Sequence, residues 1–228
     1  MSDMVLPGEP PIAVRLRRST RARRLSLRIS SLDGRVTLTL PNGVPERHAR
    51  DFAQEKEPWI RRHLAERGDD VEIAPGMHVP IGGTPHQIVA GTGRSVRLEE
   101  GLLHVPGAAD RTSARVLGFL KARAKLELAQ ASAYYADKLG RKFTAITLRD
   151  TRSRWGSCTA EGRLMYSWRL VMAPADVLAY VAAHEVAHLA ELNHGPAFWE
   201  HVRVIYGDYA AARRWLRQEG NALHRYRF

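Results

Sequence analysis

The chain has 228 residues, and 35 basic against 24 acidic side chains give it a formal net charge of +11. Hydrophobic residues make up 44% and charged residues 26%, proportions that are ordinary for a globular protein of one or two domains. No run of about 18 apolar residues occurs, and the N-terminus lacks a basic start followed by an apolar core, so we expect neither a membrane span nor a secretory signal. Cys158 is the only cysteine, which excludes an internal disulfide and any cysteine-rich zinc module and favours a cytoplasmic setting.

Positive charge is densest near the N-terminus, where the stretch from Pro10 to Leu32 contains no acidic residue. Its seven arginines are Arg15, Arg17, Arg18, Arg21, Arg23, Arg24 and Arg28. Because guanidinium groups suit phosphates and carboxylates, this stretch suggests nucleic acid or an acidic protein as a partner. The simpler interpretation is a solvated strand face, and the stretch has no aromatic residue on which single-stranded bases would stack.

The first half of the chain is predicted to be rich in strands, with one helical segment. Alternating apolar residues predict strands over 12–16, 25–29 and 36–40, and Asp33-Gly34 is a hairpin turn signal between the last two. A helix is expected from Pro45 to about Arg67, kinked or broken at Pro58. Short strands separated by glycine-containing turns follow over 77–81, 86–90, 96–98 and 102–105.

The second half is predicted to be mainly helical. Residues 106–110 read as a linker, and a long helix runs from about Arg111 to Leu139, with Asp110 as N-cap and Gly140 as its stop. Strands are expected over 143–148 and 163–171, a helix from Pro174 to about Leu192, and two shorter helices after residues 193–196, the second beginning near Asp208. The fold class is therefore α+β, with a β-rich region over 1–107 and a mainly helical domain with a small sheet over 108–228.

The helix after Pro174 contains the motif His-Glu-x-x-His, formed by His184, Glu185 and His188. Four helical residues advance the chain by about 6 Å and turn it about 40° past a full turn, so both histidines point the same way and can bind one ion. Neutral imidazoles suit Zn²⁺, and Glu185, next to the first ligand, can act as a general base on a water molecule. The competing interpretation is a purely structural histidine pair on a mostly apolar helix.

A catalytic zinc usually has three protein ligands, and His194 is the best candidate for the third. It lies six residues after His188, where Asn193 and Gly195-Pro196 allow the chain to leave the helix and turn back. His201 and Glu200 on the following helix are the competing candidates.

Cys158 and three tryptophans also invite a functional interpretation. Cys158 could be a nucleophile or a fourth ligand, but a small buried residue in a tight turn is the favoured interpretation. Trp155, Trp168 and Trp199 could shape the floor of a cleft, although large aromatic residues are more often part of a core.

Several segments together resemble one known family. The string from His184 to Leu189, followed by Asn193-His194-Gly195 and Phe198-Trp199, is similar to the YgjP-like metallopeptidases, which are related to the SprT and WLM zincins. The same family pattern includes residues 154–158 (Arg-Trp-Gly-Ser-Cys), 168–170 and 173–174, and the resemblance extends from about Ala13 to Leu216.

The resemblance implies a zincin-type catalytic domain that hydrolyses peptide bonds in a protein or peptide substrate. It implies His184, His188 and His194 as ligands of Zn²⁺ and Glu185 as the catalytic base. It also implies that a strand before the active helix, here 163–171, pairs with an extended substrate. A further donor should stabilise the oxyanion, and Tyr166, Arg169 and His224 are the candidates. The alternative function is a basic module that binds nucleic acid or an acidic partner and carries a structural zinc.

Overall fold

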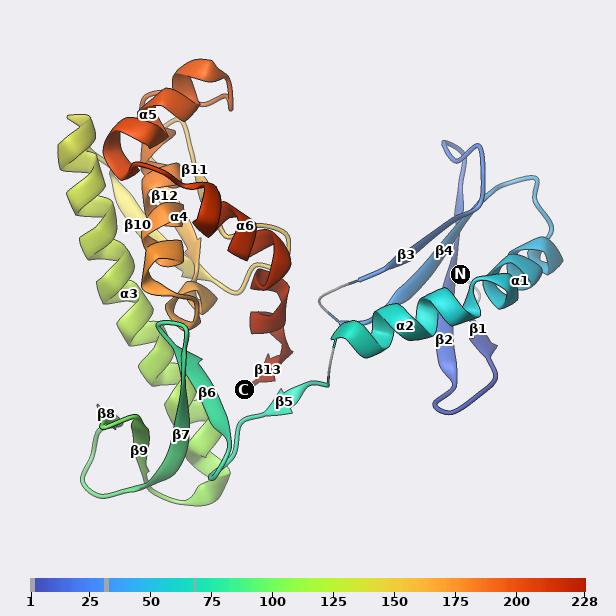
Figure 1. The fold of residues 1–228 in the computed structure, drawn as a ribbon, viewed down its shortest axis with the longest axis horizontal. Coiled ribbons are helices and arrows are strands. Elements are labelled where there is room, and N and C mark those ends of the chain that lie inside the picture. Colours follow the sequence, from blue (N-terminus) through green and yellow to red (C-terminus); the bar gives the residue numbers. More distant parts are fainter. Residues whose placement is uncertain (1–2, 31–32, 68) are drawn as a thin grey trace. The chain divides into compact units, whose positions relative to one another are not determined.

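The computed structural model describes residues 3–30, 33–67 and 69–228. The chain forms two compact units, Met1–Asp70 and Val71–Phe228, and each has a hydrophobic core of its own (Figure 1). This division lies earlier than the one at residue 107 expected from the sequence, because the strands between 71 and 106 bury their apolar residues in the core of the second unit. The α+β class is confirmed. In the described part of the chain, no helix is long and apolar enough to cross a membrane.

The first unit contains a four-stranded sheet with the order β1-β2-β4-β3. Its strands are β1 (Asp3–Leu6), β2 (Ile12–Ser19), β3 (Ser26–Ile29) and β4 (Val36–Pro41). The three strands predicted here are confirmed, and β3 pairs antiparallel with β4 around the predicted turn, of which residues 31–32 lie outside the described part. β1 was not predicted, because a strand of four residues gives too little alternation to read.

Two helices follow this sheet, α1 (Glu46–Glu55) and α2 (Glu57–Arg67). The break between them falls at Lys56, directly before the turn that contains Pro58, as the proline predicted. Ala49, Ala53 and Ile60 are fully buried and belong to the same core as the inward-facing strand residues. One face of the sheet is thereby packed and the other is left to solvent.

The second unit begins with β5 (Val71–Glu72), which pairs in parallel with the C-terminal strand β13 (Tyr226–Arg227). A second four-stranded sheet has the order β6-β7-β9-β8. Its strands, all predicted, are β6 (His78–Ile81), β7 (Thr84–Gly91), β8 (Arg97–Glu99) and β9 (Leu102–Pro106).

The long predicted helix is α3 (Thr112–Leu139), and it ends at Gly140, whose left-handed φ of 67° suits the C-cap position (Figure 1). Asp110 is not its N-cap but lies in a short 3-10 helix, η1 (Ala109–Arg111). Fully buried apolar residues recur every fourth position along α3, at Val116, Leu120, Ala124 and Leu128. This stripe belongs to the same core as the buried residues of the helix that follows Pro174.

A three-stranded sheet lies beside α3 and has the order β10-β12-β11 (Figure 1). Its strands are β10 (Ala145–Arg149), β11 (Gly156–Cys158) and β12 (Arg163–Ser167). The strand expected over 163–171 is too long, because 168–172 form a 3-10 helix, η2 (Trp168–Met172). All five residues of η2 are buried, and a short, mostly apolar stretch does not distinguish a strand from a buried helical turn.

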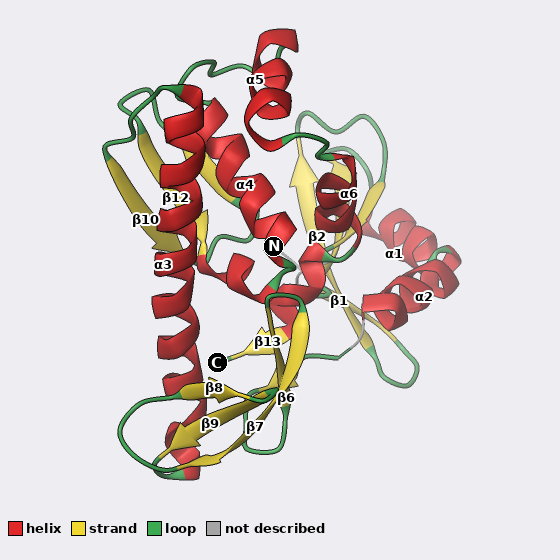
Figure 2. Cartoon of the chain, turned by 60° about the vertical axis from the view of Figure 1, so that its left-hand side comes forward, coloured by secondary structure: helices red, strands yellow, loops and turns green. Residues whose placement is uncertain are grey.

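The helix that carries the His-Glu-x-x-His motif is α4 (Ala175–Ala187), and it ends about five residues earlier than predicted. The amides of Leu189 and Ala190 donate to the carbonyls of Val186 and Ala187, so the last turn tightens and the helix stops. The chain then forms α5 (Pro196–Tyr206), α6 (Ala210–Gln218) and η3 (Gly220–Arg225) before β13 (Figure 2). The expected cap Asp208 lies one residue before the observed N-cap, Tyr209, but its carboxylate accepts a hydrogen bond of 2.9 Å from the amide of Ala210, the first residue of α6.

Candidate metal centre

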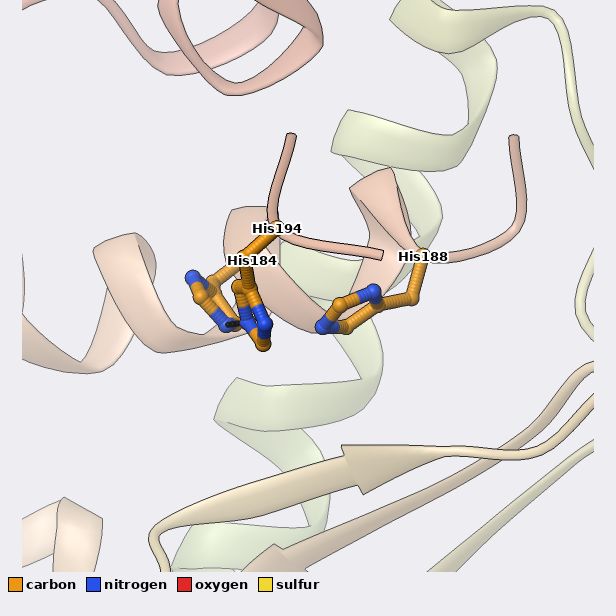
Figure 3. Close-up of side chains that lie close together, drawn as sticks. All are labelled: His184, His188 and His194. Carbon is orange, nitrogen blue, oxygen red and sulfur yellow. Dashed lines mark hydrogen bonds between the residues drawn. The ribbon is translucent and has the colours of Figure 1, made fainter. Parts of the chain in front are cut away.

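The three histidines singled out from the sequence come together in the structure. His184, His188 and His194 each offer one ring nitrogen, and these nitrogens all lie within 4.8 Å of one another (Figure 3). The Nε2 atoms of His184 and His194 are 3.1 Å apart. His184 comes from the last turn of α4, His188 caps that helix and His194 comes from the loop after it.

The chemistry of this donor set fits a divalent metal ion. The Nδ1–H of His188 donates to the carbonyl of Glu191 at 3.0 Å, so its Nε2 carries the free lone pair. Burial, together with the neighbouring imidazoles of His188 and His194, lowers the pKa of His184 to about 3, which keeps that ring neutral. The two Nε2 atoms, 3.1 Å apart, need a proton or a cation between them, and a divalent cation such as Zn²⁺ suits three imidazole donors.

The short loop after α4 decides which side chain joins the two helical histidines. Because α4 stops at His188, the chain turns back within six residues and places His194 against His184. The competing candidates His201 and Glu200 are not part of the cluster found among the described residues. Both carboxylate oxygens of Glu200 accept hydrogen bonds from Arg203 instead.

Phe198 forms the packing support of the three imidazoles. Its side chain is fully buried, and its ring centroid lies 4.9 Å from that of His184, 4.4 Å from that of His188 and 4.7 Å from that of His194. Trp199 packs beside the cluster, with its ring 5.7 Å from His184 and 5.8 Å from His194. The helix α5 thus supports the imidazoles that α4 and the following loop contribute to the cluster.

Glu185 is 5% exposed and lies beside the cluster, lining the same cavity as the three histidines. Burial raises the pKa of its carboxyl group to about 8, although the charge of Arg154 acts in the opposite direction. Across from it lies Gly156 of β11, where a β-carbon would stand 2.5 Å from the Glu185 carboxylate oxygen Oε1. The strand approaches the helix this closely only because residue 156 has no side chain.

The cavity has a volume of about 410 Å³ and opens over the histidines, between β11, α4 and α6. Trp155 and Tyr180 line it together with Arg154, whereas Trp168 is 2% exposed and belongs to the core. Tyr180 was not singled out from the sequence. Its position four residues before His184 places it on the same helix face, a spacing that would have identified it.

Cys158 lines the cavity from β11, in a strand rather than in the tight turn expected from the sequence. Burial and the nearby charge of Glu185 raise the pKa of its thiol to about 11. The thiol is therefore protonated near neutral pH, and among the described residues it is not a member of the histidine cluster. The raised thiol pKa argues against a thiolate nucleophile, and the position of Cys158 outside the cluster argues against a fourth ligand.

The three residues considered as oxyanion donors lie away from the cavity and contact other groups. The hydroxyl of Tyr166 is fully buried and hydrogen-bonded to the Ser132 hydroxyl at 2.9 Å. Arg169 holds both carboxylate oxygens of Asp150, at 2.7 and 3.1 Å, and also the carbonyls of Leu223 and Tyr226. His224 is 4% exposed and packs behind Trp155. These three residues do not line the cavity.

Comparisons with known proteins point to one family. The family model of the YgjP-like metallopeptidase domain matches residues 23–219. Among solved structures, the chain is similar to the metallopeptidase zymogen abylysin of Pyrococcus abyssi, with 17% identity over 41% of this chain and 95% of that chain and a TM-score of 0.37. No curated protein matches the chain significantly.

Proposed function

The chain belongs to the YgjP-like metallopeptidase family, and from this premise we propose that it is a zinc-dependent peptidase with His184, His188 and His194 as ligands and Glu185 as general base. The observation that carries the proposal is the convergence of three imidazoles on one point beside a buried carboxyl group. All four side chains line the same cavity of about 410 Å³.

The metal ion and the residues around it have separate roles in the proposed reaction. When bound, Zn²⁺ supplies a Lewis acid that polarises the scissile carbonyl and makes a nearby water molecule more acidic. The positive charge of a bound metal ion would favour the ionised form of Glu185, and the carboxylate would then take the proton from that water and deliver it to the leaving amine. Burial limits the contact of this carboxyl group with bulk water, and Gly156 fixes how close the wall of the cavity comes.

The substrate backbone pairs, in this proposal, with β11 rather than with the strand expected from the sequence. β12 is the central strand of its sheet and is already hydrogen-bonded to β10 on one side and to β11 on the other. β11 is the edge strand, and its residues Gly156, Ser157 and Cys158 all line the cavity. An extended peptide can add to that edge through its main chain while its side chains enter the cavity.

The alternative of a purely structural zinc is less well supported by this geometry. Structural zinc sites are closed by four protein ligands. The cluster found among the described residues holds three, and Cys158, the natural fourth, lies outside it. The open side of the cluster faces the cavity.

Metal analysis combined with peptide hydrolysis tests the proposal. The purified chain should bind about one zinc ion and cleave an unstructured protein such as casein. His194→Ala should lose the metal, whereas His201→Ala, the matched control, should retain it. Glu185→Gln should keep the metal and lose at least about 100-fold in turnover. Retention of turnover by Glu185→Gln would remove that residue from the base role, and a wild-type chain without bound zinc would refute the proposed site.

A further inference from the structure

The open face of the first unit's sheet carries a regular array of basic side chains. In β2, the buried residues Val14 and Leu16 alternate with the exposed residues Arg15 and Arg17. β3 exposes Arg28 in the same way. These arginines therefore project from the face that α1 and α2 do not cover.

The strand register places the arginines in rows across this face. Thr37 of β4 is the direct partner of Arg15 on one side and of Arg28 on the other. Thr39, two residues further along, is the partner of Arg17 and of Ser26. Hydroxyl groups and guanidinium groups thus alternate across three neighbouring strands.

The loop that joins the end of β2 to the start of β3 adds three more exposed cations beside these strands. They are Arg21, Arg23 and Arg24. In the described part of the unit, the side chains of Arg17 and Arg28, like those of the three loop arginines, have no hydrogen-bond or ion-pair partner. Free guanidinium groups of this density repel one another unless an anion lies between them.

Charge in this unit is segregated by face. Asp3 is the only acidic residue within the four strands, and it lies 4.0 Å from Arg15 at the sheet edge. The helices on the opposite side carry a balanced set of charges. Their sequences contain five acidic residues, Glu46, Asp51, Glu55, Glu57 and Glu66, and five arginines, Arg47, Arg50, Arg61, Arg62 and Arg67.

We propose that this basic face, defined by Arg15, Arg17, Arg28 and the loop arginines 21, 23 and 24, binds the phosphate backbone of double-stranded nucleic acid. The four strands contain no aromatic residue, so the face offers no platform on which unpaired bases would stack. Guanidinium groups and threonine hydroxyls are donors suited to phosphate oxygens. Contacts with phosphates do not depend on the base sequence of the nucleic acid. The proposal is independent of the metal centre.

Fluorescence anisotropy with a labelled 20-base-pair DNA duplex tests this proposal on the full chain. Binding should be salt-dependent, with a dissociation constant of about 1–100 μM at physiological ionic strength. Arg17→Gln/Arg28→Gln should weaken binding at least about tenfold and reduce the slope of log K against log salt by about 2. The matched control Arg47→Gln/Arg50→Gln removes the same charge from α1 and should change affinity less than about threefold.

Three outcomes would overturn the proposal. The first is the absence of salt-dependent binding to the duplex. The second is equal weakening by the two double variants, which would show that net charge rather than this face is responsible. The third is tighter binding to polyglutamate or to single-stranded DNA than to the duplex, which would assign the face to an acidic protein or to unpaired bases. Circular dichroism of each variant verifies that the sheet remains folded.

Discussion

Gly156 and Glu185 lie so close together that no residue with a β-carbon would fit at position 156. A β-carbon at Gly156 would lie 2.5 Å from both Cγ and Oε1 of Glu185. One residue is in an edge strand and the other is in the helix that carries the first two histidines. The glycine therefore sets the position of the proposed base relative to the edge on which we place the substrate.

Gly156→Ala should displace the Glu185 side chain and reduce turnover about 100-fold, because a shift of about 1 Å in a catalytic group has effects of this size. Zinc content should remain unchanged, because the added methyl group faces the carboxyl group and not the imidazoles. Hydrolysis rates and metal analysis of the same preparation provide the measurement.

The control for this substitution is Gly118→Ala in α3, where a β-carbon would meet open space. It should leave turnover unchanged and stabilise the helix by up to about 1 kcal/mol. Wild-type turnover of Gly156→Ala would show that Glu185 need not occupy its observed position.

Phe198→Leu should weaken zinc binding about tenfold, at a cost in unfolding free energy of only about 1–2 kcal/mol. The leucine retains most of the buried volume but loses the ring that contacts all three imidazoles. Leu120→Met, a similar change in the same core, should leave zinc affinity unaltered. Competition with a fluorescent zinc chelator measures the affinity, and equal affinities for both variants would contradict a positioning role for Phe198.

Arg169→Met should destabilise the fold by at least about 2 kcal/mol, which lowers the melting temperature by about 5 °C or more. The substitution leaves Asp150 and the carbonyls of Leu223 and Tyr226 without their donor. Arg169→Lys should rescue little, because a single ammonium group cannot replace the bidentate fork. Arg149→Met, an exposed neighbour, should change stability by less than about 0.5 kcal/mol.

Turnover distinguishes this structural role from an oxyanion role for Arg169. At a temperature where the variant is folded, turnover should remain within about threefold of wild type. A loss of 100-fold or more in turnover, with folding intact, would return Arg169 to the list of oxyanion donors.

His224 should make the fold sensitive to acid. Burial, with a contribution from the charge of Arg169, lowers the pKa of His224 to about 4, whereas an unfolded histidine has a pKa of about 6.5. Between these values the unfolded chain binds a proton that the folded chain does not, so the unfolding free energy decreases as the pH falls from 6.5 to 4. The contribution is at most about 3 kcal/mol.

Urea unfolding between pH 4 and pH 7.5 measures this dependence. The slope of the unfolding free energy against pH gives the number of protons taken up on unfolding. His224→Gln should lower that number by up to one, whatever its effect on stability at pH 7.5. The acid sensitivity of His184 and His188, whose pKa values are also lowered, is common to both proteins and cancels in the comparison. Identical slopes would show that His224 does not titrate in this range.

Features that depend on neighbours along the chain were predictable from the sequence. His184 and His188 share one face because helical periodicity is a local property, and the strands of the first unit follow from their alternating apolar residues. The break at Lys56 and the stop at Gly140 follow equally from proline and glycine backbone chemistry. The turn that brings His194 back towards the helix was likewise predictable from Asn193, Gly195 and Pro196.

Features that depend on packing between distant segments were decided only by the tertiary structure. β11 has three residues and gives no readable pattern, yet it forms the wall of the cavity and approaches Glu185 at Gly156. Tyr166 and Arg169 have donors suited to an oxyanion, but Ser132 and Asp150, 34 and 19 residues away along the chain, bind them. Which polar groups are free for chemistry depends on which have already found a partner, and that pairing is fixed only when the chain has folded.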